Sequence, residues 1–306
     1  MHPVEIEGAT KRFGDVVAVN DLALSVPEKS IYGFIGPNGS GKTTTLRMIL
    51  RILHPDAGKI RVLGAESFAA ANDRVGYLPE ERGLYKTMRV MELLQFFAAL
   101  KGRRDGRSEA KRWLDELGLG DWANKKVETL SKGMSQKVQF IAAVIARPEL
   151  LILDEPFAGL DPVNTDVIKR AVLELRERGT TILFSTHDME LAEKMCDSIC
   201  MMYKGRKVID GTLEAIQDDF GRDVVRLRLE DAMGNSKDLA QIPEVEHVND
   251  FGRLQELRLE NNADTQELLA KLMGIGTVRH FELSRPSLRD IFVRIAGPDA
   301  EEIADG

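Results

Sequence analysis

A glycine-rich stretch that joins an apolar run to a helical pattern constrains this chain more than any other feature. Residues 31–35 predict a buried strand, the letters GPNGSGKT follow at 36–43, and a helical pattern continues over 43–53. A strand before the loop and a helix after it are the context that the pattern G-x-x-x-x-G-K-[ST] requires. The simpler alternative is an ordinary glycine-rich turn between a strand and a helix.

In the phosphate-binding interpretation, each residue type of this stretch has a task. Glycines let backbone N–H groups curve around a phosphate, the helix N-terminus adds partial positive charge, and Lys42 adds a full positive charge. Thr43 offers its hydroxyl to Mg²⁺. The predicted contacts with a nucleotide are Gly36, Asn38, Gly39, Ser40, Gly41, Lys42, Thr43 and Thr44.

Two carboxylates follow a second apolar run. The strand predicted at 150–153 ends in Asp154 and Glu155, and in a doubly wound α/β fold such residues emerge at the edge of the sheet where ligands bind. Asp154 is suited to hold Mg²⁺ through water, and Glu155 to polarise a water for attack on a phosphate. Alone, the pair would read as a helix N-cap. Together with the phosphate loop, it predicts a nucleotide-hydrolysing site.

Strand-like runs alternate with helical patterns through the first two thirds of the chain. Buried strands interleaved with helices of ten or more residues are typical of a largely parallel sheet covered by helices. The strands are expected at 31–35, 75–78, 150–153, 181–184 and 199–203, and the helices at 43–53, 89–100, 132–146, 163–178 and 189–195. An antiparallel portion is expected before them, at 4–6 and 22–26.

The pattern changes after about residue 220. Val225, Leu227 and Leu229 alternate with arginines, and Leu257 and Leu259 alternate with charged residues, which indicates half-buried antiparallel sheet. A helix at 265–273, a strand at 278–283 and a helix at 287–295 complete a small α+β domain. We therefore predict a first domain at 1–219, an accessory domain at 220–296 and a disordered acidic tail at 297–306.

Further motifs lie between and after these elements. The stretch Leu130-Ser131-Lys132-Gly133-Met134 resembles the LSGGQ signature of ABC ATPases, and Gly159-Leu160-Asp161 and His187 stand where that family has its D-loop and switch histidine. The resemblance covers residues from about 4 to 215. It implies an α/β P-loop NTPase of the ABC ATPase type, with an antiparallel β subdomain and a helical signature subdomain, followed by the small α+β domain.

The resemblance also implies roles that act between two subunits. Ser131 and Gly133, at the start of a helix, would face the γ-phosphate of ATP held by the opposite subunit, and Asp161 would lie at the dimer seam. His187 would contact the γ-phosphate, although a lone histidine at a strand end often has a structural role instead. Phe13 stands at the position of the adenine-stacking aromatic, and the alternative is an ordinary core phenylalanine.

The chain departs from the family pattern in two motifs. Lys132 replaces a glycine and Met134 a glutamine, while the serine and the second glycine of the signature survive. Glu80 stands where the family usually has the glutamine that touches Mg²⁺ and the attacking water; a carboxylate still binds Mg²⁺ but adds negative charge beside ATP. The runs at 81–85 and 285–292 resemble exporter-type ABC ATPases, including sodium-export and drug-export systems, which carry a small C-terminal domain.

Composition disfavours several classes of function. The net charge is −7, whereas a protein whose main partner is nucleic acid usually shows a basic footprint. The longest apolar run, 140–146, is far shorter than the ~20 residues of a transmembrane helix, and residues 1–13 do not resemble a secretory signal. Cys196 and Cys200 have the spacing of one helical turn, and we expect them to be incidental buried thiols rather than a redox pair or half of a metal site.

Together these features predict the ATP-binding and ATP-hydrolysing subunit of a bacterial ABC transporter, in particular an exporter. We expect a cytoplasmic chain held at the inner face of the cell membrane by a membrane-spanning permease subunit, and paired with a second ATP-binding subunit, which we take to be another copy. The alternatives are an ABC ATPase acting on ribosomes or nucleic acid and a catalytically silent regulator. A single set of motifs and a pI of about 5.5 disfavour the former, and Lys42, Asp154, Glu155 and His187 disfavour the latter.

Overall fold

The chain forms two compact units, Met1–Thr212 and Leu213–Gly306. The computed structural model describes residues 2–65, 71–81, 83–221, 223–230, 239–260 and 263–297. The boundary expected at 219/220 falls at the end of a helix, α7 (Leu213–Asp219), that belongs to the second unit. The expected tail lies outside the described residues except for Gly297, and so does Arg82 of the exporter-like run.

A six-stranded sheet forms the centre of the first unit. Its order is β5-β6-β7-β3-β8-β9, and every pair is parallel except β8 with β9. β3, β6 and β7 are buried along their whole length, as a sheet covered on both faces requires. β9, which the periodicity did not predict, is an edge strand without a fully buried residue. The bounds are β3 Ile31–Ile35, β5 Val75–Leu78, β6 Leu150–Asp154, β7 Thr181–Thr186, β8 Ser198–Tyr203 and β9 Arg206–Thr212.

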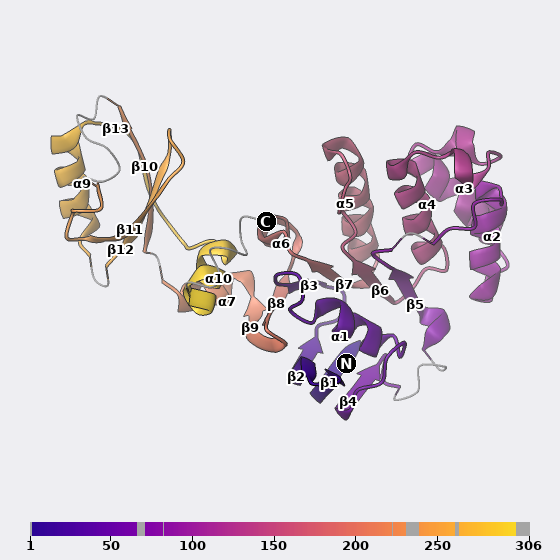
Figure 1. The fold of residues 1–306 in the computed structure, drawn as a ribbon. Helices are drawn as coiled ribbons and strands as arrows, with labels where there is room; N and C mark the ends of the chain where they lie inside the picture. Colours follow the sequence, from indigo (N-terminus) through magenta and orange to yellow (C-terminus); the bar gives the residue numbers. More distant parts are fainter. Residues whose placement is uncertain are drawn as a thin grey trace. The chain divides into compact units, whose positions relative to one another are not determined.

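One face of this sheet is covered by a helix and a second sheet. Phe34 and Ile152 belong to an apolar cluster with Leu46 and Ile49 of α1 and with the three-stranded antiparallel sheet β2-β1-β4. Figure 1 shows α1 between the two sheets. α1 ends before the predicted residue 53, because Arg51 adopts a left-handed backbone with φ 56°. The bounds are α1 Lys42–Ile49, β1 Val4–Phe13, β2 Val16–Val26 and β4 Ala57–Val62.

The opposite face carries a group of helices. Ile31 and Phe184 of the sheet share one apolar cluster with α2 to α6. Trp113 of α3 and Phe140 of α4 lie in it with ring centroids 6.0 Å apart, edge to face at 84°. Charged residues dominate the sequence of α3 and concealed this helix from the prediction. The bounds are α2 Val90–Leu100, α3 Gly106–Glu116, α4 Lys132–Val144, α5 Pro162–Glu177 and α6 Met189–Met195.

The second unit is built on a four-stranded antiparallel sheet of order β11-β12-β10-β13. Leu227 and Leu257 pack against Leu268 and Leu272 of α9, which covers one face (Figure 1). This confirms the predicted half-buried sheet, to which β11 adds an unpredicted strand. No helix among the residues given above is both long and apolar enough to cross a bilayer. The bounds are β10 Val224–Glu230, β11 Val245–Asp250, β12 Gln255–Leu259, α9 Thr265–Ile275, β13 Thr277–Ser284 and α10 Leu288–Ala296.

Candidate functional site

The glycine-rich loop between β3 and α1 is packed closely against its neighbours. Gly36 has φ 147°, and a Cβ atom there would lie 2.2 Å from the carbonyl oxygen of Met202 in β8. Gly41 has φ 104°, and a Cβ atom there would lie 2.5 Å from the carbonyl oxygen of Ala18 in β2. Both positions therefore require glycine, for backbone conformation and for space. The loop keeps a curved path into the start of α1, the geometry that binds anions through N–H groups.

Lys42 is buried inside this loop. It is 6% exposed, and its Nζ donates to the carbonyl oxygens of Gly36 at 2.6 Å and Pro37 at 3.1 Å. Burial lowers the pKa of Lys42, although nearby carboxylates, Glu155 foremost, oppose that shift. The Ser40 hydroxyl is buried without a hydrogen-bond partner among the described residues. An ammonium and an unpaired hydroxyl in one curved loop fit a ligand with several anionic oxygens, such as the phosphates of a nucleotide.

Asp154 ends β6 beside this loop with 2% of its surface exposed. Its Oδ1 accepts hydrogen bonds from the hydroxyls of Thr43 at 3.3 Å and Ser185 at 2.5 Å. Ser185 lies on β7, and its Oγ also accepts from the backbone N–H of Glu155 at 3.2 Å. The structure thus brings Thr43 and Asp154 together as predicted. The sequence analysis did not identify Ser185 as a site residue. The sequence feature that could have indicated it is a hydroxyl at the end of a buried strand, two residues before His187.

The donor set around Asp154 suits a metal bound jointly with phosphate oxygens. Within the described ranges, no three His, Cys, Asp or Glu side chains gather into a site that could hold a metal ion alone. Mg²⁺ in nucleotide sites uses one or two protein carboxylates, water and substrate phosphates instead. The Thr43 hydroxyl beside the Asp154 carboxylate fits that mode, and Glu80 lines the same cavity as Asp154.

Glu155 follows β6 in an unusual backbone conformation. Its φ of 47° lies in the left-handed region, which residues other than glycine adopt rarely. Its Oε1 lies 3.0 Å from Nδ1 of His187. The Glu155 side chain is 11% exposed and that of His187 57%. In this arrangement, the shielded Glu155 carboxylate next to the exposed imidazole can accept a proton from an activated water.

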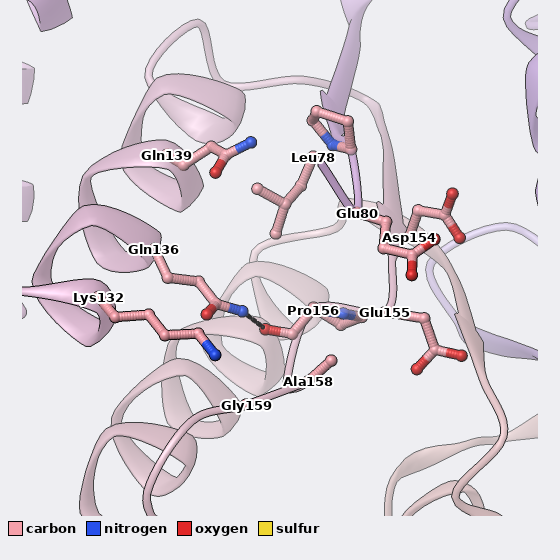
Figure 2. Close-up of a pocket in the computed structure, with 11 residues that line it drawn as sticks. Leu78, Glu80, Lys132, Gln136, Gln139, Asp154, Glu155, Pro156, Ala158 and Gly159 are labelled. Atoms are coloured by element: carbon pink, nitrogen blue, oxygen red, sulfur yellow. Dashed lines mark hydrogen bonds between the residues drawn. The ribbon is translucent and has the colours of Figure 1, made fainter. Parts of the chain in front are cut away.

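A cavity of about 250 Å³ opens beside these carboxylates. Figure 2 shows that its lining comes from the end of β5, the loop after β6 and one side of α4. Glu80 and Lys132 both line it, so the chain's two charged departures from the family pattern share one cavity. Gln136 and Gln139 of α4 line it as well and were missed. Their signal was a pair of polar residues among the apolar positions of a helix.

Ser131 and Asp161 each begin a helix. Ser131 Oγ accepts from the N–H of Met134 at 3.2 Å at the start of α4, and Asp161 Oδ1 accepts from the N–H of Asn164 at 3.0 Å at the start of α5. The hydrogen bonds from Asn164 lower the pKa of the Asp161 carboxyl. A Cβ atom at Gly133 would lie 2.9 Å from Nδ2 of Asn164. In the part of the chain that the structure describes, no hydrogen bond joins this group to the phosphate loop.

Comparison with known proteins assigns the family. Residues 19–158 match the ABC transporter family, and residues 211–296 match the family described as ATP-binding protein DrrA1-3-like, C-terminal domain. The ABC transporter ATP-binding protein YhaQ of Bacillus subtilis is 44% identical over 95% of this chain and 98% of its own length. The chain belongs to the ABC transporter ATP-binding proteins. As an ABC ATPase, it binds and hydrolyses ATP.

Further relatives of this ABC ATPase match almost its whole length. Nod factor export ATP-binding protein I of Burkholderia lata is 35% identical over 98% of this chain and 99% of its own. Linearmycin resistance ATP-binding protein LnrL of Bacillus subtilis is 31% identical over 96% of this chain and 98% of its own length. A solved ATP-binding subunit of an ABC transporter is 31% identical, with a TM-score of 0.66 over 71% of this chain and 93% of that one. The predicted family and fold are confirmed.

The remaining predicted contacts of the ABC ATPase lie around the phosphate loop and at the end of β1. Asn38 and Gly39 are exposed in the loop, and Thr44 is half-buried in the first turn of α1. Phe13 is 48% exposed, so it is not the core residue of the alternative interpretation. The Nζ of Lys11 lies 5.7 Å from the centroid of its ring. An exposed ring next to a cation can receive a flat ligand by stacking.

The two cysteines take no part in this site. Both are free thiols, Cys200 buried and Cys196 half-buried. Burial raises the pKa of each thiol. Thiols that stay protonated are poor nucleophiles and poor metal ligands.

Proposed function

We propose that this ABC ATPase works as a pair of identical subunits that close around two ATP molecules and drive a membrane-spanning partner. The observation that carries the proposal is the division of the site. Lys42 and Asp154 are buried in the chain, whereas Ser131 and Asp161 cap helix starts at the surface. An exposed serine at the positive end of a helix is suited to a phosphate brought from outside the chain. A two-fold pair supplies this phosphate to both copies.

In the proposed site, each subunit holds one ATP by the loop from Gly36 to Thr44, with Phe13 against the adenine. Thr43, Asp154 and Glu80 would hold Mg²⁺, which neutralises phosphate charge when bound. Glu155 takes the proton of the attacking water, and His187 faces the γ-phosphate. The second subunit completes the site with Ser131, Gly133 and Asp161.

We also propose that the complex is an exporter. Two relatives that match almost the whole chain are named for Nod factor export and for linearmycin resistance. The match of the second unit to a DrrA1-3-like C-terminal domain supports the same subfamily. Through its permease, the ABC ATPase would lie at the cytoplasmic face of the membrane.

The variant Glu155→Gln in the full chain tests the paired site. The amide keeps the shape of the side chain but accepts no proton, so ATP binding should persist while hydrolysis falls at least about a hundredfold. Size-exclusion chromatography with light scattering should then find a dimer with ATP and Mg²⁺ and a monomer with chelator. Glu177→Gln, an exposed position near the end of α5, is the matched control and should keep full activity.

Two outcomes would contradict this proposal separately. A Glu155→Gln variant that stays monomeric with ATP and Mg²⁺ would contradict the pairing of subunits. Unchanged hydrolysis would contradict the role of Glu155. Fractionation of cells that contain the chain at its natural level tests the membrane partner, and recovery with ribosomes instead of membranes would favour the alternative function.

A further inference from the structure

Helix α4 carries two buried glutamines on one side. Gln136 is 6% exposed and Gln139 is 7% exposed, and both line the cavity beside the carboxylates. Residues three apart are neighbours on a helix surface. A buried amide needs hydrogen-bond partners, which an apolar side chain of the same size does not. The hydrogen-bond partners of Gln136 and Gln139 therefore indicate the role of these two residues.

Each glutamine bonds a different loop. Nε2 of Gln136 donates to the carbonyl oxygen of Pro156 at 2.6 Å, the bond drawn in Figure 2. Nε2 of Gln139 donates to the carbonyl oxygen of Glu81 at 3.3 Å. Both acceptors belong to the main chain, so these bonds hold the paths of the loops and not only their side chains.

The two loops are those that carry the carboxylates of the proposed site. Pro156 directly follows Glu155, and Glu81 directly follows Glu80. Lys132 faces the same cavity, but in the described ranges no hydrogen bond or ion pair joins it to either loop. Among the described residues, the two amide bonds thus connect α4 directly to the main chain of both loops.

The start of α4 is the part proposed to meet the second subunit. α4 begins with the Ser131 cap and is 13 residues long. At 1.5 Å per residue, the distance along its axis from Ser131 to Gln139 is only about 12 Å. A hydrogen-bonded helix this short moves as one body, so a displacement at its start reaches both bonded loops.

We infer that Gln136 and Gln139 are positioning residues that make the catalytic loops of one subunit respond to the nucleotide held by its partner. The inference rests on the proposed pairing of subunits. A phosphate drawn against Ser131 fixes the position of α4, and the two amide bonds carry that position to Glu155 and Glu80. Each subunit then hydrolyses ATP efficiently only when the opposite site is filled.

The variant Gln136→Met in the full chain is the first test, because methionine keeps the length and removes the donor. Initial ATPase rates measured against ATP concentration should give the wild type a Hill coefficient approaching two, the number of sites. In the variant, the Hill coefficient should fall to about one and kcat about tenfold. ATP affinity from calorimetry should stay within about twofold, because no contact with the nucleotide is lost.

Gln139→Met and Gln95→Met complete the series. Gln139→Met should lower kcat by only about threefold, because its hydrogen bond is the longer one. Gln95, half-buried on α2 and outside the cavity, is the matched control and should keep both kcat and the Hill coefficient. If Gln136→Met does not fold, which circular dichroism shows, Gln139→Met carries the test. If the glutamine variants lose both kcat and ATP affinity while their Hill coefficient stays at the wild-type value, the glutamines have only a structural role.

The wild type, measured in parallel, separates the two proposals. A wild type without ATPase activity, or a Glu155→Gln variant that never dimerises, would contradict the proposed function. A cooperative wild type whose glutamine variants are equally cooperative would leave that function standing and overturn only the inference about α4.

Discussion

The two halves of the proposed nucleotide site are held by different parts of the fold. The strand-borne half lies at the carboxyl edge of the parallel sheet and comprises the phosphate loop with Lys42, Asp154, Glu155 and His187. The helix-borne half lies at the starts of α4 and α5 and comprises Ser131, Gly133 and Asp161. In the strand-borne half, Asp154 accepts bonds from two neighbouring segments. In the helix-borne half, the hydrogen bonds that the Ser131 and Asp161 side chains accept among the described residues come from their own helices.

This difference separates what a single chain does from what a pair does. The residues of the strand-borne half all lie within one chain, so variants of these residues should alter nucleotide binding by a single subunit. In the proposed pair, the helix-borne half meets the nucleotide of the other subunit, so variants in that half should keep ATP binding by a single subunit and reduce hydrolysis. Variants in the two halves can therefore test the comparison directly.

The largest effect is expected for Lys42→Ala. The change deletes the full positive charge from the phosphate loop, and charge-assisted bonds to phosphate are among the strongest in proteins. Calorimetry should show ATP affinity lowered by about a hundredfold or more, equivalent to about 3 kcal/mol. Lys194→Ala on the exposed face of α6 is the control. Unchanged affinity in Lys42→Ala would remove the phosphate loop from the site.

Ser185→Ala tests whether the strand-borne half depends on the pairing of β6 with β7. The change removes the hydroxyl that donates to the buried Asp154 carboxylate and accepts from the backbone N–H of Glu155. A buried bond to a charged group contributes about 1.5–3 kcal/mol, so kcat should fall roughly tenfold to a hundredfold. Ser185→Thr keeps the hydroxyl and should recover part of the rate. Equal rates in the alanine and threonine variants would show that the hydroxyl plays no part.

Ser131→Ala tests the helix-borne half. Hydrolysis should fall about tenfold while ATP affinity of the single subunit stays within about twofold, because the lost contact belongs to the opposite site. Removing a serine cap also destabilises a helix by about 1 kcal/mol. Ser287→Ala, which removes the cap of α10, is the matched control for that loss. Similar ATPase rates in the two variants would place Ser131 outside the nucleotide site.

The smallest effect is expected for Glu80→Gln. Burial lowers the pKa of Lys42, and the charges of Glu155, Asp154 and, least of the three, Glu80 oppose that shift. Glu80 lines the same cavity as the other two carboxylates, so its negative charge should oppose phosphate binding. Glu80 is exposed, and solvent screening weakens that opposition. We expect Glu80→Gln to narrow the gap between ATP affinities with Mg²⁺ and with chelator by about threefold. An equal gap in both proteins would take Glu80 out of the metal site.

The strand-borne half could be predicted because its chemistry coincides with a local pattern. β3 with its glycine loop, and β6 with its two carboxylates, appear in consecutive residues, and the strands lie where the apolar runs placed them. Ser185 could not be assigned in this way, because its role depends on β7 lying beside β6. Gln136 and Gln139 bond residues 20 and 58 positions away. No local periodicity indicates which loops a helix will contact.

The fold showed the same division between local and long-range information. The helices and strands with a clear apolar pattern were found, including β10, β12 and β13 of the second unit but not β11. α3 was missed because charged residues mask its apolar side, and β9 because an edge strand has no buried face to show in the sequence.

The backbone of Glu155 places catalysis and thermal stability in conflict. A left-handed conformation costs a residue with a Cβ atom roughly 1–2 kcal/mol, and asparagine tolerates it better than glutamate. Replacing Glu155 by asparagine should therefore raise the melting temperature by about 2–4 °C while abolishing hydrolysis. Selection for thermal stability alone would therefore favour loss of Glu155, whereas selection for ATP hydrolysis retains it.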